Sequence, residues 1–272
     1  MIALYILIPI LSLLALLCLL YLAILIRPCK RKEIDQRLLC DYAHRGLHGN
    51  GIPENSLAAF EFACQKGYGI ELDVQLSKDG EVMVFHDYSL ERMTGRKEKL
   101  CELDAKELTC LSLAGTEQTI PTLTRVLELV AGRVPILVEL KGESTDSSLC
   151  PKVAELLRAY KGPYCMESFN PMLVMTVRKQ MPDILCGLLY TNVCRDKKKC
   201  SALNLLLTAM AFNFLARPQF IAFNKIDRNS PAVRLSTKLY HAPKFVWTVN
   251  TKEELETAHS LGEHPIFEKI HE

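Results

Sequence analysis

The first apolar segment of the chain is long and carries no charge. Residues 2–26 are almost wholly apolar. At about 1.5 Å per residue, a helix of this length spans a bilayer core of about 30 Å with some tilt. A cleaved signal peptide would need a basic start, a shorter apolar core and a small-residue cleavage site, and none of these is visible. The pattern therefore predicts an uncleaved transmembrane anchor over residues 1–27.

Positive charges follow the apolar segment at once. Arg27 ends the expected anchor, and Lys30, Arg31 and Lys32 follow in what we expect to be a basic juxtamembrane linker over residues 28–38. Because Lys and Arg favour the cytoplasmic side, a single-pass anchor in the cell membrane would leave the rest of the chain in the cytoplasm. The 11 cysteines are scattered without a C-x-x-C pair or a zinc-type spacing, which fits free thiols in a reducing compartment.

A period-two pattern follows further along the chain, over residues 69–76. Four apolar side chains alternate with Glu71, Asp73 and Gln75. Successive side chains of a β-strand point to opposite faces, so this segment is predicted to be a strand with one polar face. Two carboxylates then lie on that face.

The next residues predict the return arm of a hairpin. Asp79-Gly80 is a strong turn signal, and residues 82–85 form an apolar run. If Asp79 and Gly80 are the two loop residues, Asp73 lies opposite His86, with a Cβ separation of about 4.5–5.5 Å. We therefore expect a histidine beside the two carboxylates.

The remaining chain alternates between helical and extended patterns. Helices are expected over residues 57–66, 122–130, 152–160, 171–180, 202–215, 231–239 and 252–261. Apart from the hairpin arm, eight strands are expected, which end near residues 44, 75, 140, 169, 190, 224, 249 and 267. Repeated β-α units in one domain indicate parallel strands, and eight of them predict an α/β fold, the (β/α)8 TIM barrel, over residues 39–272.

Two segments of this domain allow two interpretations each. Residues 202–215 are uncharged but are interrupted by Asn204 and Asn213, and they are too few for a second membrane span. This segment is either a buried barrel helix or an apolar lip that rests on the bilayer. The basic run over residues 195–199 is either a solvated loop or a contact for anionic lipid head groups.

Carboxylates at the ends of different strands indicate a metal site. Barrel enzymes carry their sites at the C-terminal ends of the strands, where Glu71, Asp73 and Glu139 are expected. Neighbouring carboxylates repel one another unless a cation lies between them or one is protonated. Three of them match a hard, oxygen-preferring ion such as Mg²⁺ or Ca²⁺ better than zinc. On its own, E-x-D on a strand is also compatible with a plain polar face.

Histidines and cations occur beside these carboxylates. His44 and His86 have the chemistry of a general base and a general acid, although each alone could be structural. Arg45 and Lys141 supply positive charge suited to a phosphate, or they pair with Glu54 and Glu139. The formal net charge of +2 argues against a broad nucleic-acid surface.

An ordered set of motifs resembles the glycerophosphodiester phosphodiesterase family. The set is H-R-G, P-E-N-S, E-L-D-V, K-D-G, H-D and V-E-L-K, followed by W-T-V-N, and it covers about residues 41–267. The resemblance implies a barrel of the kind found in phosphatidylinositol-specific phospholipase C. One motif departs from the pattern, because many members end with a G-x-D-x-I-x-T-D-like strand and this chain has G-E-H-P-I-F-E over residues 262–268.

The resemblance also implies roles for the candidate residues. The family's metal ligands match Glu71, Asp73 and Glu139, its acid and base match His44 and His86, and its phosphate site matches Arg45, Glu54 and Lys141.

We therefore expect a membrane-anchored enzyme that uses one divalent cation, Mg²⁺ or Ca²⁺. It would hydrolyse glycerophosphodiesters to an alcohol and sn-glycerol 3-phosphate. The alternatives are a lysophospholipase D acting on lysophospholipids, and a non-catalytic, membrane-tethered binder of phosphodiester head groups. The pair of histidines argues against a binder, because binding alone does not need two proton-transfer groups. No nucleic-acid partner is expected, and the sequence indicates no particular oligomeric state.

Overall fold

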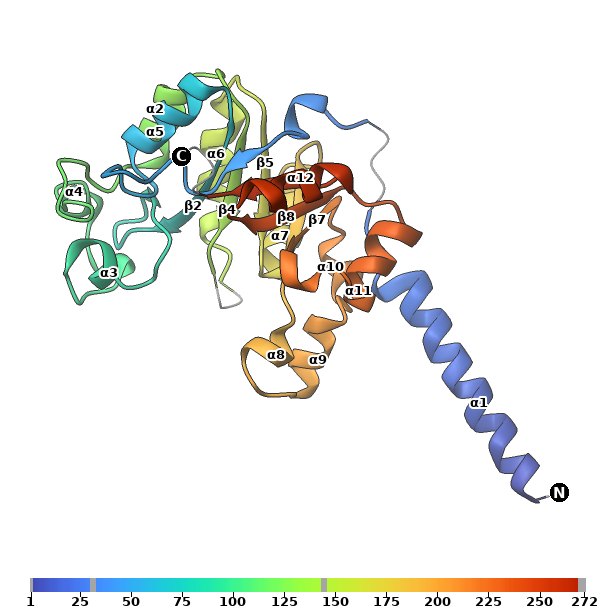
Figure 1. Cartoon of the computed structure of the whole chain (residues 1–272). Helices are drawn as coiled ribbons and strands as arrows, with labels where there is room; N and C mark the ends of the chain where they lie inside the picture. The colour runs from blue at the N-terminus through green and yellow to red at the C-terminus, as the bar shows by residue number, and fades with distance from the viewer. Residues whose placement is uncertain (1, 30–32, 143–145, 269–272) are drawn as a thin grey trace.

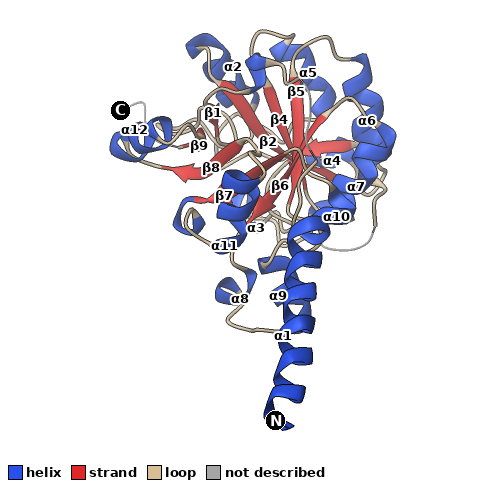
Figure 2. Ribbon diagram, turned by 90° about the vertical axis from the view of Figure 1, so that its right-hand side faces the viewer, coloured by secondary structure: helices blue, strands red, loops and turns tan. Residues whose placement is uncertain are grey.

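A closed barrel of eight parallel strands forms the body of the protein (Figure 2). The computed structural model describes residues 2–29, 33–142 and 146–268. In chain order the barrel strands are β1 Tyr42–Ala43, β2 Gly69–Leu76, β4 Ile136–Leu140, β5 Tyr164–Ser168, β6 Leu185–Tyr190, β7 Phe220–Asn224, β8 Lys244–Val249 and β9 His264–Phe267. Because β1 pairs with both β2 and β9, the sheet closes on itself. The predicted (β/α)8 TIM barrel is therefore confirmed.

Helices of very different length surround the barrel. They are α2 Leu57–Lys66, α3 Glu91–Thr94, α4 Ala105–Leu108, α5 Leu123–Val130, α6 Leu149–Ala159, α7 Pro171–Gln180, α8 Val193–Asp196, α9 Ala202–Thr208, α10 Asn213–Ala216, α11 Pro231–Arg234 and α12 Lys252–Ser260. Several are capped as their sequences require: Ser56 accepts from the Ala59 amide at the start of α2, and Gly67 ends that helix in the left-handed region.

The alternation of β2 divides its side chains between two environments. Ile70, Leu72 and Val74 belong to the main core between the sheet and the helices. Glu71 and Asp73 point to the other side of the strand, into the barrel. A second apolar cluster fills part of the barrel interior and includes Tyr42, Leu137, Cys165, Phe220 and Phe245. The polar residues of β2 are thus held in a buried site by strands that are packed on both faces.

The predicted hairpin forms, but its predicted register is wrong by one residue. Strand β3, Val82–Val84, pairs with β2 so that Val74 lies opposite Val84. The Ser77 amide donates to the Glu81 carbonyl, so the loop has three residues and Gly80 adopts a φ of +82°. A three-residue loop ending in a left-handed glycine is the common alternative to a two-residue turn. Asp73 therefore lies beside Phe85, and His86 follows after the strand has ended.

The prediction of one helix over residues 202–215 is also wrong. This segment forms the two short helices α9 and α10, which are separated by a turn in which Met210 has a φ of +50°. Both asparagines use their amides to bind backbone: Asn204 donates to the Lys199 carbonyl and Asn213 to the Ile26 carbonyl. Leu203 is 56% exposed. The segment is therefore not a continuous buried barrel helix.

The N-terminal helix projects away from the barrel (Figure 1). It consists of α1, Ile2–Leu20, and a continuing π-helical turn, Tyr21–Leu25. Of this helix, Tyr5–Leu25 is long and apolar enough to cross a membrane, a property that signal sequences share. Its last turn is bound to the barrel domain, because the Tyr21 hydroxyl donates to the Ala209 carbonyl and Ile26 is fully buried. The end of the helix is therefore held against the domain.

Candidate active site

Three carboxylates converge at the ends of β2 and β4. The parallel register of these strands places Asp73 directly beside Glu139. Glu71, Asp73 and Glu139 are 1%, 0% and 6% exposed, and each offers an oxygen within 4.8 Å of the other two. Carboxylates buried this deeply need compensating positive charge.

Two cations and one amide already contact the triad. The Lys141 ammonium lies 2.8 Å from Asp73 Oδ1 and 2.7 Å from Glu139 Oε1. The Asn55 amide donates to Asp73 Oδ2 at 2.8 Å, and Arg45 Nε lies 3.6 Å from the same oxygen. Lys141, which we expected at the phosphate, thus lies between two of the expected metal ligands.

The site still carries more acid than base. Glu167 on β5 is 2% exposed and lies beside Glu139, and its Oε2 has no hydrogen-bond partner among the described residues. Burial, together with Asp73, Glu139 and Glu167, raises the pKa of Glu71 well above its usual value. Burial also raises the pKa of Glu139 to about 7, against the opposing effect of Lys141. A divalent cation would allow these carboxylates to ionise together, so the residues present fit such an ion.

His44 follows β1, the strand that closes the barrel by pairing with both β2 and β9. Its Nδ1 is 2.5 Å from Glu268 Oε1, and its Nε2 is 3.9 Å from Glu71 Oε2. Burial raises the pKa of Glu268, but the contacts with His44 and His48 lower it more, so this carboxyl group is ionised near neutral pH. One ring nitrogen of His44 therefore faces an orienting carboxylate and the other faces the triad.

His86 lines the same inner pocket as His44 and has a similar arrangement. Its Nδ1 is 2.6 Å from Asp87 Oδ1, and Asp87 Oδ2 accepts from Arg92 Nε at 2.5 Å. Burial is the main cause that lowers the pKa of His86, and Lys141 and Arg45 lower it further. His86 thus reaches the site although the hairpin pairing predicted for it is wrong.

Arg45 and Glu54 form part of a charged group at the rim. Arg45 has a φ of +56°, and its backbone amide donates to Glu71 Oε2 at 2.8 Å. Its guanidinium donates to Glu54 Oε1 at 2.8 Å, and Arg92 donates to the same oxygen at 2.6 Å. The positive charge of Arg45 is therefore held close to both the triad and the opening of the site.

Sequence reasoning did not select several residues that the structure places here. Asp87 follows His86 directly in the H-D motif, so that adjacency was an available signal. Glu268 occurs in the strand that departs from the family pattern, and only the closure of the barrel brings it to His44. His48, which lies in the loop after β1, has Nε2 3.9 Å from Glu268 Oε1.

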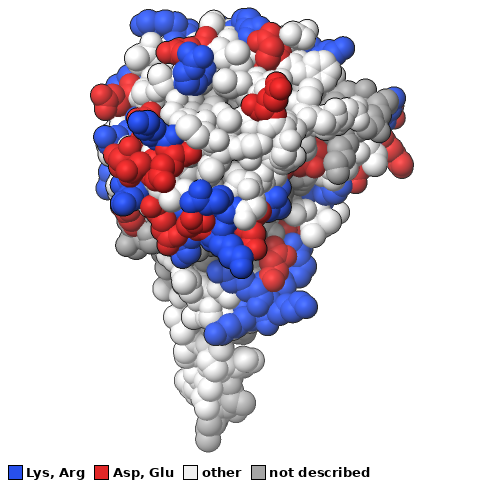
Figure 3. Space-filling view, turned by 90° about the vertical axis from the view of Figure 1, so that its left-hand side faces the viewer, with Lys and Arg blue, Asp and Glu red and all other residues white. Residues whose placement is uncertain are grey.

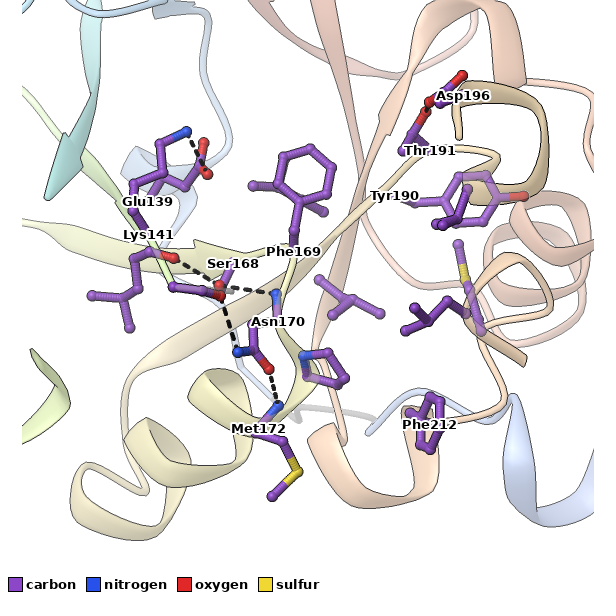
Figure 4. Close-up of a pocket in the computed structure, with 18 of the residues that line it drawn as sticks. Glu139, Lys141, Ser168, Phe169, Asn170, Met172, Tyr190, Thr191, Asp196 and Phe212 are labelled. Carbon is purple, nitrogen blue, oxygen red and sulfur yellow. Dashed lines mark hydrogen bonds and ion pairs between the residues drawn. The ribbon is translucent and has the colours of Figure 1, made fainter. Parts of the chain in front are cut away.

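The reacting groups line a small inner pocket of about 120 Å³ that continues into a larger cavity of about 860 Å³. Residues shared by the two include His86, Glu139 and Lys141. Figure 4 shows Glu139 and Lys141 at one end of the larger cavity and Tyr190 and Phe212 at the other. A substrate can therefore extend from the charged groups across the ends of β5 and β6.

The structure defines a class of protein at this point: a barrel enzyme whose two histidines, each paired with a carboxylate, lie in one pocket with a buried acidic cluster. The sequence model of the glycerophosphoryl diester phosphodiesterase family matches residues 44–268. The chain belongs to that family, and it is a phosphoric diester hydrolase.

Known relatives support this assignment. A glycerophosphodiester phosphodiesterase of Caldanaerobacter subterraneus subsp. tengcongensis is 34% identical over 236 residues, which cover 81% of this chain and 89% of that protein. The lysophospholipase D GDPD1 of Rattus norvegicus is 34% identical over 140 residues, 46% of this chain and 43% of that protein. The structure of an Oleispira antarctica phosphodiesterase, solved with its product sn-glycerol-3-phosphate, superposes with a TM-score of 0.68 at 24% identity, covering 84% of this chain and 92% of that one. This last similarity is one of fold.

Proposed function

We propose that the protein is a membrane-anchored, metal-dependent enzyme that hydrolyses glycerophosphodiesters to an alcohol and sn-glycerol 3-phosphate. The observation that carries this proposal is the pair of histidines in one pocket with a buried carboxylate triad, each with its own carboxylate partner. A non-catalytic binder of head groups would have no use for two oriented proton-transfer groups.

The triad is the proposed metal site. Glu71, Asp73 and Glu139 would hold one Mg²⁺ or Ca²⁺. A bound ion would stabilise the negative charge that develops on the phosphoryl group during the reaction. Lys141 lies against two of these carboxylates, so we propose that its ammonium, together with Arg45, also faces the phosphate oxygens. Glu54 positions Arg45 through the 2.8 Å contact at the rim.

The two histidines divide the proton transfers. One accepts the proton of the oxygen that attacks phosphorus, and the other donates a proton to the departing alcohol. Water is added overall. Glu268 and Asp87 each contact Nδ1 of their histidine, which leaves Nε2 as the nitrogen available to the substrate on His44 and on His86. Fixing the ring in this way is the function that a carboxylate has in other acid–base pairs.

Product analysis tests this activity directly. The full chain, reconstituted in vesicles of diacyl phosphatidylglycerol, is stripped with a chelator and assayed on glycerophosphocholine with Mg²⁺ or Ca²⁺ restored. We expect choline and sn-glycerol 3-phosphate in equal amounts, and no turnover without the ion. Tight binding of glycerophosphocholine and lysophosphatidylcholine without turnover under any divalent cation would establish the binder instead.

The membrane arrangement is a separate proposal. We place the anchor at residues 1–27, the basic linker at residues 28–38 and the catalytic domain at residues 39–272, on the cytoplasmic side of the cell membrane. The charge-free apolar helix and the basic residues after it support this arrangement. Trypsin added outside intact cells should leave the domain uncut, whereas it should cut the exposed residues 197–199 in permeabilised cells. Cleavage there in intact cells would reverse the orientation.

A further inference from the structure

Glu167 is a buried acidic residue that the proposed reaction does not use. It lies on β5, it is 2% exposed, and it lines the inner pocket together with His44 and His86. Its Oε2 has no hydrogen-bond partner among the described residues. A buried polar atom without a partner costs free energy, so a protein that keeps one beside its active site is expected to use it. Glu167 is therefore a candidate for contact with the substrate.

The two strand positions beside Glu167 hold no partner of opposite charge. The register places Glu139 of β4 on one side of it and Gly187 of β6 on the other. A side chain at Gly187 is excluded, because a Cβ there would lie 2.1 Å from the ring of Phe220. Cys165, which precedes Glu167 on the same face of β5, belongs to the apolar cluster inside the barrel. The inner pocket is the direction from which a partner can approach.

Other acidic residues of the molecule are paired. Glu71 accepts a hydrogen bond from a backbone amide. Asp73 and Glu139 both contact the Lys141 ammonium. On the outer surface, many acidic side chains lie beside Lys or Arg side chains (Figure 3). Glu167 thus differs both from the proposed metal ligands and from these surface acids.

The proposed metal ion is not the partner of Glu167. The three triad residues each offer an oxygen within 4.8 Å of the others, and Glu167 does not belong to that group among the described residues. Oxygen ligands lie about 2.0–2.6 Å from Mg²⁺ or Ca²⁺, so two ligands of one ion are about 5 Å apart at most. The phosphate is not its partner either, because a carboxylate repels an anion that Lys141 and Arg45 attract. The remaining candidate is an uncharged part of the substrate.

The rest of the inner pocket suits a small group that has both carbon atoms and hydroxyl groups. The pocket has a volume of about 120 Å³, and its lining includes the apolar side chains of Phe169, Leu189, Trp247 and Ile266. The rings of Phe169 and Trp247 are in edge contact, with centroids 5.6 Å apart. Carbon atoms can pack on these side chains while a hydroxyl group reaches Glu167. Glycerol, the part that all glycerophosphodiesters share, has this chemistry, and the variable alcohol can extend into the larger cavity.

We propose that Glu167 binds a hydroxyl group of the glycerol and thereby selects glycerophosphodiesters over phosphodiesters of other small alcohols. The inference rests on the proposed function and assigns a specificity-determining residue to it. A hydroxyl group both donates and accepts, so it pairs with Glu167 whether that carboxyl group is ionised or protonated. A site that hydrogen-bonds a substrate hydroxyl rejects the analogue without it, because the buried group of the protein is then left unpaired.

Ligands that lack one hydroxyl group test this contact. The full chain in micelles of a nonionic detergent, saturated with Mg²⁺ or Ca²⁺, is titrated by calorimetry with sn-glycerol 3-phosphate. The same titration is made with 3-hydroxypropyl phosphate and 2-hydroxypropyl phosphate, each of which lacks one of its hydroxyl groups. We expect one analogue to bind roughly 10–100-fold more weakly than sn-glycerol 3-phosphate, the effect of leaving one buried polar group unpaired. Because binding is measured, a hydroxyl group that reacts does not disturb the comparison.

Variants assign the difference to Glu167. Glu167→Leu should abolish the difference between the ligands, whereas Glu167→Gln, which keeps an amide that can bind a hydroxyl group, should retain part of it. Glu263→Gln is the matched control. Glu263 is 4% exposed and pairs with Arg228 just before the start of β9, whereas the site lies at the ends of the strands. This control should show the full wild-type difference.

Thermal stability separates specificity from a structural role. Glu167→Leu removes no hydrogen bond of Oε2 to the described residues, so the Tm of the ligand-free protein should be unchanged or higher. A lower Tm together with a retained difference between the ligands would make Glu167 a structural residue and overturn the inference. If Glu167→Leu does not fold, the wild type and Glu167→Gln still decide the outcome.

The other results are also distinguishable. Equal binding of the three ligands by the wild type overturns the inference and leaves the proposed function intact. A loss of metal affinity in Glu167→Leu as large as that in Glu139→Gln would make Glu167 a metal ligand, which also overturns it. Absence of choline release from glycerophosphocholine by the wild type with either ion removes the proposed function itself.

Discussion

Two neighbouring parts of the same barrel mouth are built in opposite ways. The side formed by β1, β2 and β4 contains buried charges held in place by strand register, such as Asp73 beside Glu139. The side formed by the end of β6 with α9 and α10 is lined mainly by apolar side chains, and many of them come from residues 202–215, which belong to no strand. Buried charges tolerate little displacement, because each must keep its partners, whereas an apolar wall needs only volume and shape. The comparison therefore separates reaction chemistry from substrate choice.

This separation makes a specific claim about mutations. Changes on the acidic side should lower activity on every substrate, because each substrate presents the same phosphodiester. Changes on the apolar side should matter only for substrates that carry a chain. The following predictions test that claim from the largest expected effect to the smallest.

The histidines should have the largest effect. His44→Ala and His86→Ala should each lower kcat by about 10²–10⁴-fold on glycerophosphocholine and on lysophosphatidylcholine alike, because a positioned acid or base contributes that much. Substrate binding, measured separately, should fall much less. The double variant should lose far less than the product of the single losses, since both groups serve one reaction. Near-wild-type turnover in both single variants would contradict the assignment.

The carboxylates should come next. Glu71→Gln, Asp73→Asn and Glu139→Gln should each weaken metal affinity by about 10²-fold or more. Mutation of residues that only contact the metal ligands already weakens metal affinity by about 10–100-fold. Metal titration by calorimetry measures the affinity, and excess ion should restore part of the activity. Full activity of the wild type after thorough chelation would refute the metal site.

The orienting carboxylate should have a smaller effect. Glu268→Gln removes the charge that faces Nδ1 of His44 and should lower kcat by about 10–100-fold, less than the loss of the histidine itself, because the imidazole remains in place. KM and Tm should change little, because the side chain positions a proton-transfer group rather than the substrate. Glu256→Gln, a matched change at an exposed position of α12, serves as the control. A parallel change in KM or Tm would point to a structural role instead.

The smallest effect belongs to the apolar side. Phe212→Leu keeps the wall apolar but makes it smaller, so it should lower kcat/KM for long-chain lysophosphatidylcholine by about two- to fivefold, since only part of one apolar contact is lost. Activity on glycerophosphocholine should stay at the wild-type value. An equal loss on both substrates would mean that the two sides of the mouth are not independent.

The strand pattern of the acidic side was readable from the sequence alone. The alternation over residues 69–76 predicted β2 with its observed bounds and the shared face of Glu71 and Asp73, because side-chain alternation is a local property of an extended chain. The order of β-α units likewise predicted the barrel. The hairpin register depended on one residue of loop length, and here the prediction was wrong.

The apolar side and the orienting contact were decided by tertiary structure. Residues 202–215 are apolar in any fold, so composition could not show that a turn at Met210 divides the segment into two short helices and that Leu203, Leu207 and Leu215 line a cavity. Glu268 and His44 are 224 positions apart and meet only because β9 pairs with β1. The periodicity of a segment depends on its local backbone conformation, so the sequence reveals it. Contacts between distant residues depend on which strands pair when the barrel closes.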